Sequence, residues 1–406
     1  LCLALSLLLG LFFPTAIAAE ISKELGYVAS SILLAIYLAL GLTANSISQP
    51  SLLICSLTIN ATLLLATLLS PLSALAPGAF TFYFLLSGLF LLDVRSVRFT
   101  PFLEHLFTVS SITLLVLASA LVLPSETVIK FFIDNYSAFY PELLPAMFRL
   151  GKPVLVFGSH SLAGFFYFLF FLLNFLQYTH RKSFLSLLLA VCFLFGSLAL
   201  QSVTAYVYVI GGLVHILIHF GVHRIVAVRM CALAVALGIV CVLVFSGDAQ
   251  HLVWSAISPL FMSNVNGLAA RYTSFGTLAP NIDYILAHPF TPIGVRYSEE
   301  LWFVDSGFVE HLLRGSVALL LAVYVGFFLF LKKNLRLTSH SLLLFAVYFA
   351  FEVGFSNLTY LRTLYLTPFV IVFLNAVSRD TGADLYCADG LFPEADLEQR
   401  HNSTAT

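Results

Sequence analysis

Apolar runs of about twenty residues recur along the whole chain, and they constrain its fold more than any other feature. A helix of that length spans the hydrocarbon core of a bilayer. In a chain of 406 residues, 60% hydrophobic residues and a mean hydropathy of +1.00 supply more apolar surface than a soluble domain could bury. Backbone groups in hydrocarbon must be hydrogen-bonded within their own segment, so each run is expected to be helical. The sequence therefore predicts an all-α, polytopic helical membrane protein.

We predict about twelve membrane-spanning helices. Their approximate bounds are 1–19, 26–45, 51–74, 78–93, 101–123, 160–178, 184–200, 203–220, 230–246, 307–331, 340–356 and 361–378. The first run ends like a signal peptide but lacks a basic stretch before its apolar part, so we count it as a span. Residues 1–378 then form one membrane domain, and the polar tail 379–406 is expected to be loosely ordered on the cytoplasmic side.

Basic side chains occupy every second short connection between these spans, which indicates that those connections face the cytoplasm. The residues are Arg95, Arg98, Arg181, Lys182, Arg224, Arg229, Lys332, Lys333 and Arg336. Both termini then lie in the cytoplasm, and the two long loops 124–159 and 247–306 lie outside it. In a bacterium, both long loops would then lie in the periplasm.

Composition and spacing argue against two kinds of partner. A net charge of −1 gives no charge-driven attraction to nucleic acid. The six cysteines lie in apolar runs or in the last segment without metal-type spacing, so we expect neither disulfides nor zinc. His215 and His219 stand four residues apart, but no third ligand is near, and we interpret them as core or interfacial histidines.

Several cationic side chains fall on the predicted outer side, against the orientation rule. They are Arg149, Lys152, Arg271, Arg296, Arg314 and Arg362. Long loops are exempt from the rule, so ordinary solvated charge is one explanation for those in loops. Guanidinium groups at outer helix ends also suit a diphosphate, through paired hydrogen bonds and a charge that never titrates. Within the span 340–356, the carboxylate of Glu352 is a candidate ion-pair partner for Arg362.

The smaller loop contains two local patterns. Residues 125–136 fit an amphipathic helix that lies on the membrane surface and is capped by Ser125. Glycines and a proline between 151 and 164 predict irregular backbone where the chain re-enters the bilayer. That segment is either a simple loop-to-helix turn or backbone packed against protein or a water-filled cavity.

Three motifs resemble the O-antigen ligase and polymerase superfamily of bacterial membrane glycosyltransferases. Residues 267–272 and 285–295 are similar to its Ser-Gly-Arg, helix and Pro-x-x-Gly-x-Gly turn, although Ala269-Ala270 replaces Ser-Gly and Val295-Arg296 stands where the second glycine is expected. Residues 305–308, Asp-Ser-Gly-Phe, are similar to the start of the following span in polymerases. Residues 152–164 are similar to a third motif, with Lys152 at its usual arginine and Arg149 three residues upstream.

This resemblance implies a GT-C-like glycosyltransferase acting outside the cytoplasm. The donor would be a glycan on undecaprenyl diphosphate, and the acceptor would be the sugar end of a second lipid-linked repeat unit. Lipopolysaccharide ligases tend to carry His-Asn where this chain has Asp305, so the resemblance favours a polysaccharide polymerase. A chain-length regulator protein is an expected partner. No Asp-x-Asp pair occurs in the outer loops, so we expect a metal-independent reaction with no cofactor.

The resemblance also suggests roles for individual residues. Arg271 would stabilise the leaving diphosphate, assisted by Lys152 or Arg149 and by Arg296. Asp305 would act as the base or orient the acceptor, and its alternative role is the N-cap of the next helix.

The remaining predicted substrate-binding residues follow in or after the tenth predicted span. They are His311, Arg314 and Arg362, and Glu310 and His311 are nearby substitutes for the base.

Two other functions stay open at this stage. A ligase of the same superfamily would move finished glycan to lipid A core or to a protein, and product analysis separates it from a polymerase. A lipid-linked sugar flippase or another secondary transporter belongs to a different class. Transporters commonly show internal repeats and discontinuous spans at mid-membrane. No clear repeat is visible here, and the charged residues cluster at the predicted outer rim.

Overall fold

The computed structural model describes residues 2–12, 49–95, 97–122, 125–136, 143–200, 202–221, 271–272, 276–301, 306–335 and 339–381. Within these ranges the chain is mostly helical, as predicted. The exception is a two-stranded antiparallel ladder of β1 (Ala74–Leu75) and β2 (Arg296–Tyr297). It joins the connection after the second described helix to the predicted outer loop.

The helices have bounds close to those expected from the apolar runs. They are α1 (Cys2–Phe12), α4 (Pro50–Leu69), α5 (Pro77–Leu91), α6 (Pro101–Val122), α7 (Glu126–Tyr136), α8 (Leu143–Arg149), α9 (His160–Arg181), α10 (Phe184–Ala199), α11 (Val203–Gly221), α15 (Ala279–Ala287), α16 (Gly307–Asn334), α17 (Ser339–Glu352) and α18 (Leu361–Thr381). Ten of the twelve predicted spans overlap a described helix. The other two, 26–45 and 230–246, lie outside the described residues, as does 382–406.

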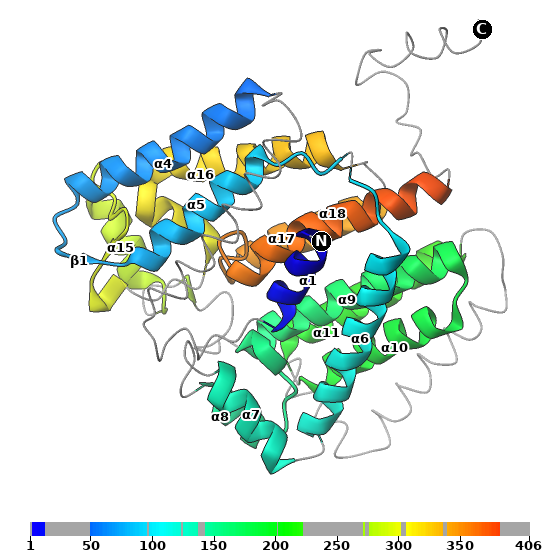
Figure 1. Cartoon of the computed structure of the whole chain (residues 1–406). Helices are drawn as coiled ribbons and strands as arrows, with labels where there is room; N and C mark the ends of the chain where they lie inside the picture. Colours follow the sequence, from blue (N-terminus) through cyan, green and yellow to red (C-terminus); the bar gives the residue numbers. More distant parts are fainter. Residues whose placement is uncertain are drawn as a thin grey trace, which may run out of the picture.

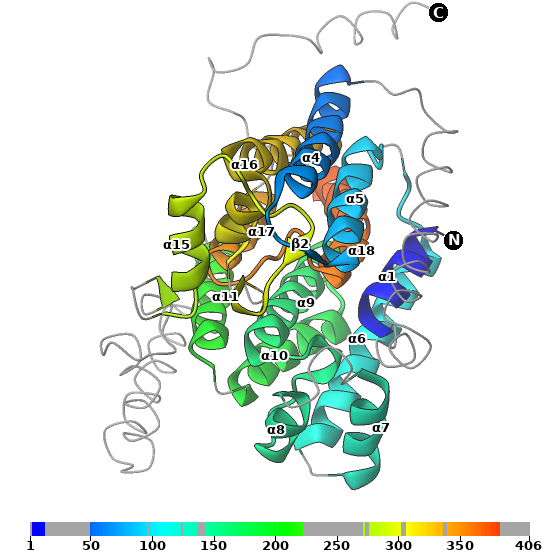
Figure 2. The same cartoon turned by 90° about the vertical axis from the view of Figure 1, so that its left-hand side faces the viewer.

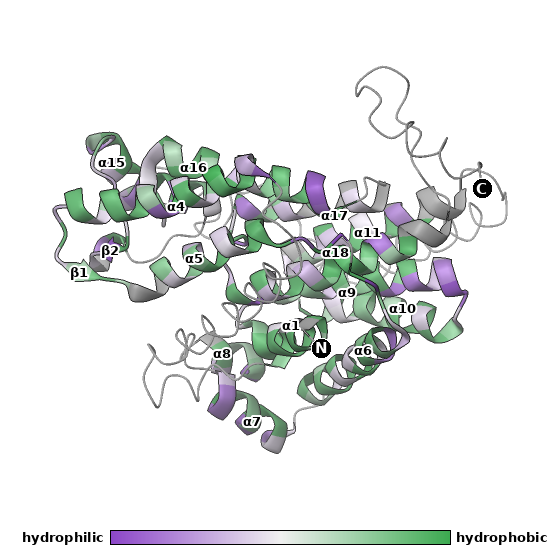
Figure 3. Cartoon of the chain, turned by 45° about the horizontal axis from the view of Figure 1, so that its top comes forward, coloured by the Kyte–Doolittle hydropathy of each residue, from purple (hydrophilic) through white to green (hydrophobic). Residues whose placement is uncertain are grey.

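Four of the described helices are long and apolar enough to cross a membrane: α4, α6, α9 and α16. Shorter apolar helices include α1, α5, α10 and α18. Figure 3 shows that the helices are largely hydrophobic, with hydrophilic residues mainly at their ends and in α7 and α8. These features fit a helical membrane protein, and the number of crossings stays a prediction.

Local sequence explains where several helices begin. Proline opens α4, α5 and α6, where its missing N–H costs no hydrogen bond and its fixed φ suits the first turn. α9 begins after Ser159, whose hydroxyl accepts the N–H of Leu162 at 3.2 Å. It ends at Lys182, which adopts a left-handed conformation and donates its N–H to the carbonyl of Tyr178.

Helix α9 lies at the centre of one group of helices and contacts α10, α11 and α18. Residues 162–177 of α9 are all buried, as expected for a helix that is apolar on every face. A second group consists of α4, α5 and α16, and α18 lies between the two groups (Figures 1 and 2). α1 packs along α18, and a side chain at Gly10 would clash with Leu366. The tertiary structure is thus two helix groups joined through α18.

The basic connections that are described gather at one end of the helices, which we call the basic end. There Arg181 forms an ion pair with Glu104 at 3.1 Å, and Lys333 lies 3.8 Å from Asp93. The side chain of Asn334 accepts the N–H of Val94 at 2.8 Å. The last residues of α5, α9 and α16 and the first turn of α6 therefore lie on one side of the molecule. The opposite side, where α9, α16 and α18 begin and α17 ends, is called the site end.

The predicted irregular backbone before α9 is confirmed. Gly151 and Gly158 have φ values of +66° and +79°, and Leu155 has a φ of +52° in the short 3₁₀ helix Leu155–Phe157. This 3₁₀ helix is buried, and the Phe157 ring stacks on Phe166 with ring centres 4.2 Å apart. The segment therefore packs against protein and is not a simple exposed turn.

Candidate functional site

Ser306 is the N-cap of α16. Its hydroxyl accepts the N–H of Val309 at 3.4 Å and donates to the carbonyl of Glu352 at 3.5 Å. The capping role considered for Asp305 therefore belongs to the next residue. Asp305 lies outside the described residues, so its role as a base stays a prediction. Ser306 fixes the start of α16 against the end of α17.

A buried polar network lies next to this N-cap, where α5, α16 and α17 meet. The Tyr83 hydroxyl lies 2.6 Å from Nδ1 of His311, and Nε2 of His311 lies 3.8 Å from Oε2 of Glu352. The Tyr324 hydroxyl donates to the same Oε2 at 2.9 Å. Tyr83, His311 and Glu352 are each at most 1% exposed. Polar groups this deep are costly unless paired, so the network fixes how α5, α16 and α17 pack.

Gly307 makes room for this network. A Cβ at residue 307 would stand 1.7 Å from Oε2 of Glu352 and 3.3 Å from the Cα of Ser356. Only glycine allows the first turn of α16 to approach the carboxylate so closely. Gly307 therefore lets the first turn of α16 lie directly against Glu352.

Glu352 also holds the connection between α17 and α18. Its Oε1 accepts the N–H of Leu358 at 2.6 Å. Within this connection the hydroxyls of Ser356 and Thr359 lie 2.6 Å apart, and the Thr363 hydroxyl donates to Asn357 Oδ1 at 2.7 Å. The connection is thus tightly ordered, and two of its carbonyls face the predicted outer loop.

Those two carbonyls bind the segment that carries Arg271. Nη1–H of Arg271 donates to the carbonyl of Gly354 at 3.1 Å, and the Tyr272 hydroxyl donates to the carbonyl of Val353. The Tyr272 hydroxyl also lies 2.8 Å from Oγ of Ser306. Arg271 is half-buried at the site end and does not point into open solvent.

Lys152 and Arg271 lie near enough to His160 for both positive charges to act electrostatically on its ring, although the two residues belong to segments far apart in the sequence. Burial lowers the pKa of Lys152 from its usual value. Nδ1 of His160 is buried without a hydrogen-bond partner. The combined positive charge of these two side chains near His160 would favour an anion bound there.

Arg149 is placed differently from Lys152. Its side chain is exposed at the end of α8, and its Nε–H reaches only the carbonyl of Pro145 in the same helix, at 3.4 Å. Of the two cations considered for the motif arginine, Lys152 is therefore the one whose charge acts on His160 together with that of Arg271.

Arg296 and Arg314 hold the loop before α16 in place. Arg296 donates to the carbonyls of Thr67 and Ser73, each at 2.9 Å. Arg314, 8% exposed, donates to Glu310 at 3.0 Å and to the carbonyl of Gly294 at 3.1 Å. Their hydrogen-bonding groups are thus directed at protein atoms.

Gly294 is the point at which this loop touches both α4 and α16. Its φ is +61°, and a Cβ there would stand 2.4 Å from the backbone nitrogen of Thr67. The N–H groups of Ile293 and Gly294 donate to the carbonyls of Leu313 and Arg314, each at 2.9 Å. Those carbonyls are released from helical pairing by a kink at Gly315 and Ser316. The loop therefore takes over the hydrogen bonds that the kink breaks.

Arg362 joins α18 to α1. It is 4% exposed, donates to the carbonyl of Gly10 at 3.2 Å and lies 5.8 Å from the centre of the Tyr136 ring. Glu352, the ion-pair partner considered for Arg362, instead has its Oε2 3.8 Å from Nε2 of His311. Among the described residues, no group of three or more His, Cys, Asp or Glu side chains could hold a metal ion.

Sequence reasoning missed Tyr83, Tyr324 and His160 as members of this site. Tyrosines within apolar runs carry no signal that distinguishes a network member from a core aromatic. His160 follows the motif glycine Gly158 closely, so its position next to that motif was the available signal.

Comparison with known proteins adds no relative: no family model, no curated protein and no solved structure matches the chain.

Proposed function

We propose that this protein is a membrane glycosyltransferase that polymerises lipid-linked repeat units. It takes a glycan from undecaprenyl diphosphate and adds it to the sugar end of a second lipid-linked unit. The observation that supports this proposal is that the positive charges of Lys152 and Arg271 both act on His160, at the end of the bundle opposite the basic connections. The positive-inside rule assigns that end to the periplasmic side of a bacterial inner membrane, with both termini in the cytoplasm.

The chemistry needs a cation where negative charge develops. An acceptor hydroxyl attacks the anomeric carbon of the donor sugar, and the bond from that carbon to the diphosphate oxygen breaks. Arg271 and Lys152 neutralise the charge that grows on the departing undecaprenyl diphosphate. Asp305, next to the N-cap of α16, takes the proton from the acceptor hydroxyl. Glu352 and Ser306 hold the carbonyls against which Arg271 and Tyr272 are positioned.

This assignment narrows the set of candidate substrate-binding residues. Arg271 and Lys152 keep that role. Arg149 is exposed at the end of α8. Arg296, Arg314 and Arg362 bind backbone carbonyls, as Arg271 does at Gly354, and Arg271 differs from them because its charge acts on His160 together with that of Lys152. His311 stabilises the start of α16 through Tyr83 and Glu352.

The test measures chain growth in proteoliposomes supplied with an undecaprenyl-diphosphate-linked oligosaccharide. Arg271→Ala should lower the rate by about 10²–10³-fold, as the loss of one charge-stabilising group does in other transfer enzymes. Lys152→Ala should also lower it. Lys130→Ala is the matched control, because Lys130 is an exposed cation on α7 at the same end. Long products from both Arg271→Ala and Arg271→Lys would refute the assignment.

One observation favours a second candidate function. A buried His–Glu pair within a helix bundle is typical of proton-coupled transport, and His311 and Glu352 form such a pair. A transporter or flippase would move the lipid-linked sugar across the bilayer without lengthening it. The same proteoliposomes separate the two functions, because only a polymerase yields longer glycans.

A further inference from the structure

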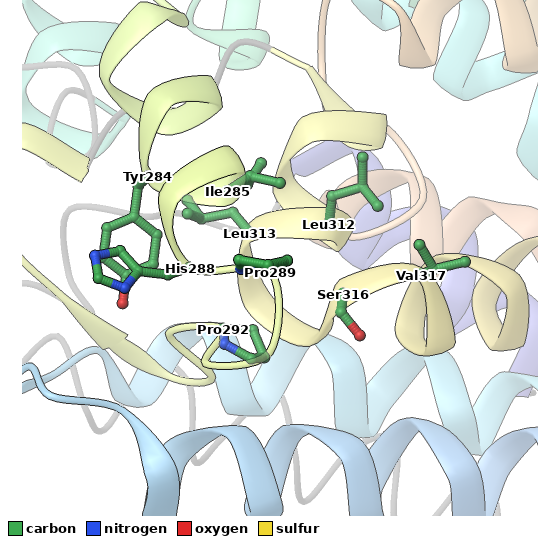
Figure 4. A pocket seen from close by; sticks show the side chains of 9 residues that line it. All are labelled: Tyr284, Ile285, His288, Pro289, Pro292, Leu312, Leu313, Ser316 and Val317. Carbon is green, nitrogen blue, oxygen red and sulfur yellow. The ribbon is translucent and has the colours of Figure 1, made fainter.

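A small cavity lies between the loop after α15 and the kink in α16 (Figure 4). Its volume is about 90 Å³. Ile285, Pro289, Leu312 and Val317 give it a mainly apolar lining. The Tyr284 hydroxyl donates to the carbonyl of Thr291 at 3.2 Å, and the Tyr284 and His288 rings lie 4.6 Å apart. These contacts hold the loop in the shape that leaves the cavity open.

The last turn of α15 and the loop after it each expose one large apolar side chain close to the cavity. Phe290 is 89% exposed, the highest value for any large hydrophobic residue in the described ranges, and Leu286 is 73% exposed. Phe290 follows Pro289, which lines the cavity directly. Burial of such side chains is favourable. An apolar environment around Leu286 and Phe290 would therefore stabilise this part of the chain.

Helix α16 has an exposed apolar face next to the cavity. After the kink it runs from Val317 to Asn334, which is about 27 Å at the rise of an α-helix and close to the thickness of a bilayer core. One face of this segment carries Val317, Leu321, Val325 and Phe328, which are between 47% and 61% exposed. In a membrane-spanning helix that face contacts lipid.

The cavity connects these two apolar surfaces. Val317 is the first residue of the exposed stripe and also lines the cavity. Pro289 lines the other side, next to Phe290. The loop after α15 therefore lies beside the point on α16 at which the exposed apolar stripe begins.

We propose that residues 286–290 dip into the hydrocarbon of the adjacent leaflet, and that the cavity at the α16 kink receives part of one lipid hydrocarbon chain. The loop thus lies in the membrane surface, with its backbone held by α16 and its apolar side chains directed into lipid. This inference requires only that α16 spans the bilayer, so it is independent of the reaction catalysed.

The first experiment measures the depth of residue 290. Trp254 and Trp302 are first replaced by Phe, and Phe290→Trp then provides the single tryptophan. The variant protein is reconstituted in nanodiscs of phosphatidylcholine with brominated chains, which quench nearby tryptophan fluorescence. The high exposure of Phe290 makes this substitution compatible with the fold. Glu300→Trp is the matched control, an exposed position on the short 3₁₀ helix Glu299–Leu301 that contacts α15.

Phe290→Trp should be quenched severalfold more than Glu300→Trp, and more by bromines near the headgroups than by bromines near the chain ends. Equal quenching of the two variants overturns the membrane contact. Shielding of residue 290 from both bromolipid and aqueous acrylamide also overturns it, because a protein partner would then cover the loop.

A second experiment addresses the cavity. A nitroxide attached to Ser316→Cys should collide with oxygen more often than with a water-soluble nickel complex if hydrocarbon fills the space. The reverse order would mean that water occupies the cavity and would refute that part of the proposal. The unfolding midpoint of each variant serves as the check that the fold is retained.

Discussion

At the scale of single residues, the site end depends on a carboxylate buried against a glycine. Glu352 accepts hydrogen bonds from Tyr324 and from the N–H of Leu358, and Gly307 leaves the space it occupies. Removing an acceptor of this kind leaves buried donors unsatisfied, at a cost of about 1–3 kcal/mol for each. The first turn of α16 and the connection after α17 are thus held by one side chain.

Gly307→Ala should destabilise the protein by about 1–3 kcal/mol, because the added methyl group overlaps the Glu352 carboxylate. Gly211→Ala is the control, since a Cβ at Gly211 meets no atom within 4 Å. That change should be neutral or stabilising by up to about 1 kcal/mol, the helix-propensity difference between the two residues. Unfolding in mixed micelles measures both, and equal effects would contradict the role of Gly307.

The lowered pKa of Lys152 gives the proposed enzyme a pH dependence. Burial favours the neutral amine, so Lys152 loses its proton at a lower pH than an ordinary lysine. If the ammonium binds the donor diphosphate, kcat/KM falls as the pH rises through that lowered pKa. Lys152→Arg should keep activity at higher pH, because arginine stays protonated. Rates of polymerisation against pH test this, and identical alkaline limits for both proteins would exclude Lys152 from donor binding.

At the scale of secondary-structure elements, the kink in α16 and the loop before it form one unit. Ser316 has a φ of +61°, which is unfavourable for a residue with a side chain, and the loop compensates by satisfying the carbonyls of Leu313 and Arg314. Arg296 ties the same loop to α4. The loop is therefore held by backbone and guanidinium hydrogen bonds that reach two helices.

Arg296→Ala should lower the free energy of unfolding by about 1–3 kcal/mol, since two carbonyls lose a charged donor. At a temperature where the variant is folded, Arg296→Ala should leave the KM for the lipid-linked donor unchanged. Arg149→Ala, an exposed arginine, serves as the stability control. A selective loss of donor affinity in Arg296→Ala would instead return Arg296 to the substrate-binding set.

At the scale of the whole molecule, two chemically different ends are separated by apolar helices. Ion pairs of Arg181 and Lys333 mark the basic end, whereas Arg271 and Lys152 mark the site end. The basic end should face the cytoplasm because basic connections are retained there during insertion.

This orientation predicts which positions a membrane-impermeant maleimide reaches in intact cells. In a cysteine-free background, Lys130→Cys on α7 should be labelled without permeabilisation. Arg98→Cys, at the exposed connection before α6, should be labelled only after permeabilisation. The opposite pattern would place the site end in the cytoplasm and remove the periplasmic reaction.

The sequence by itself determined the helices and the irregular segment before α9. Both follow from local rules: a run of apolar residues must pair its own backbone in hydrocarbon, and Gly151 and Gly158 permit positive φ wherever the chain turns. The sequence also singled out six cations on the predicted outer side, with Arg271 and Lys152 among them.

Only the tertiary structure decided which polar groups meet. Tyr83, His311 and Glu352 belong to three helices, and their contact depends on how those helices pack. The same packing turned Arg296 and Arg314 toward backbone carbonyls and placed Lys152 and Arg271 where both charges act on His160. A hydrophobic pattern predicts that a helix face is buried. It does not predict which helix packs against that face, because an apolar face can pack against many different apolar faces.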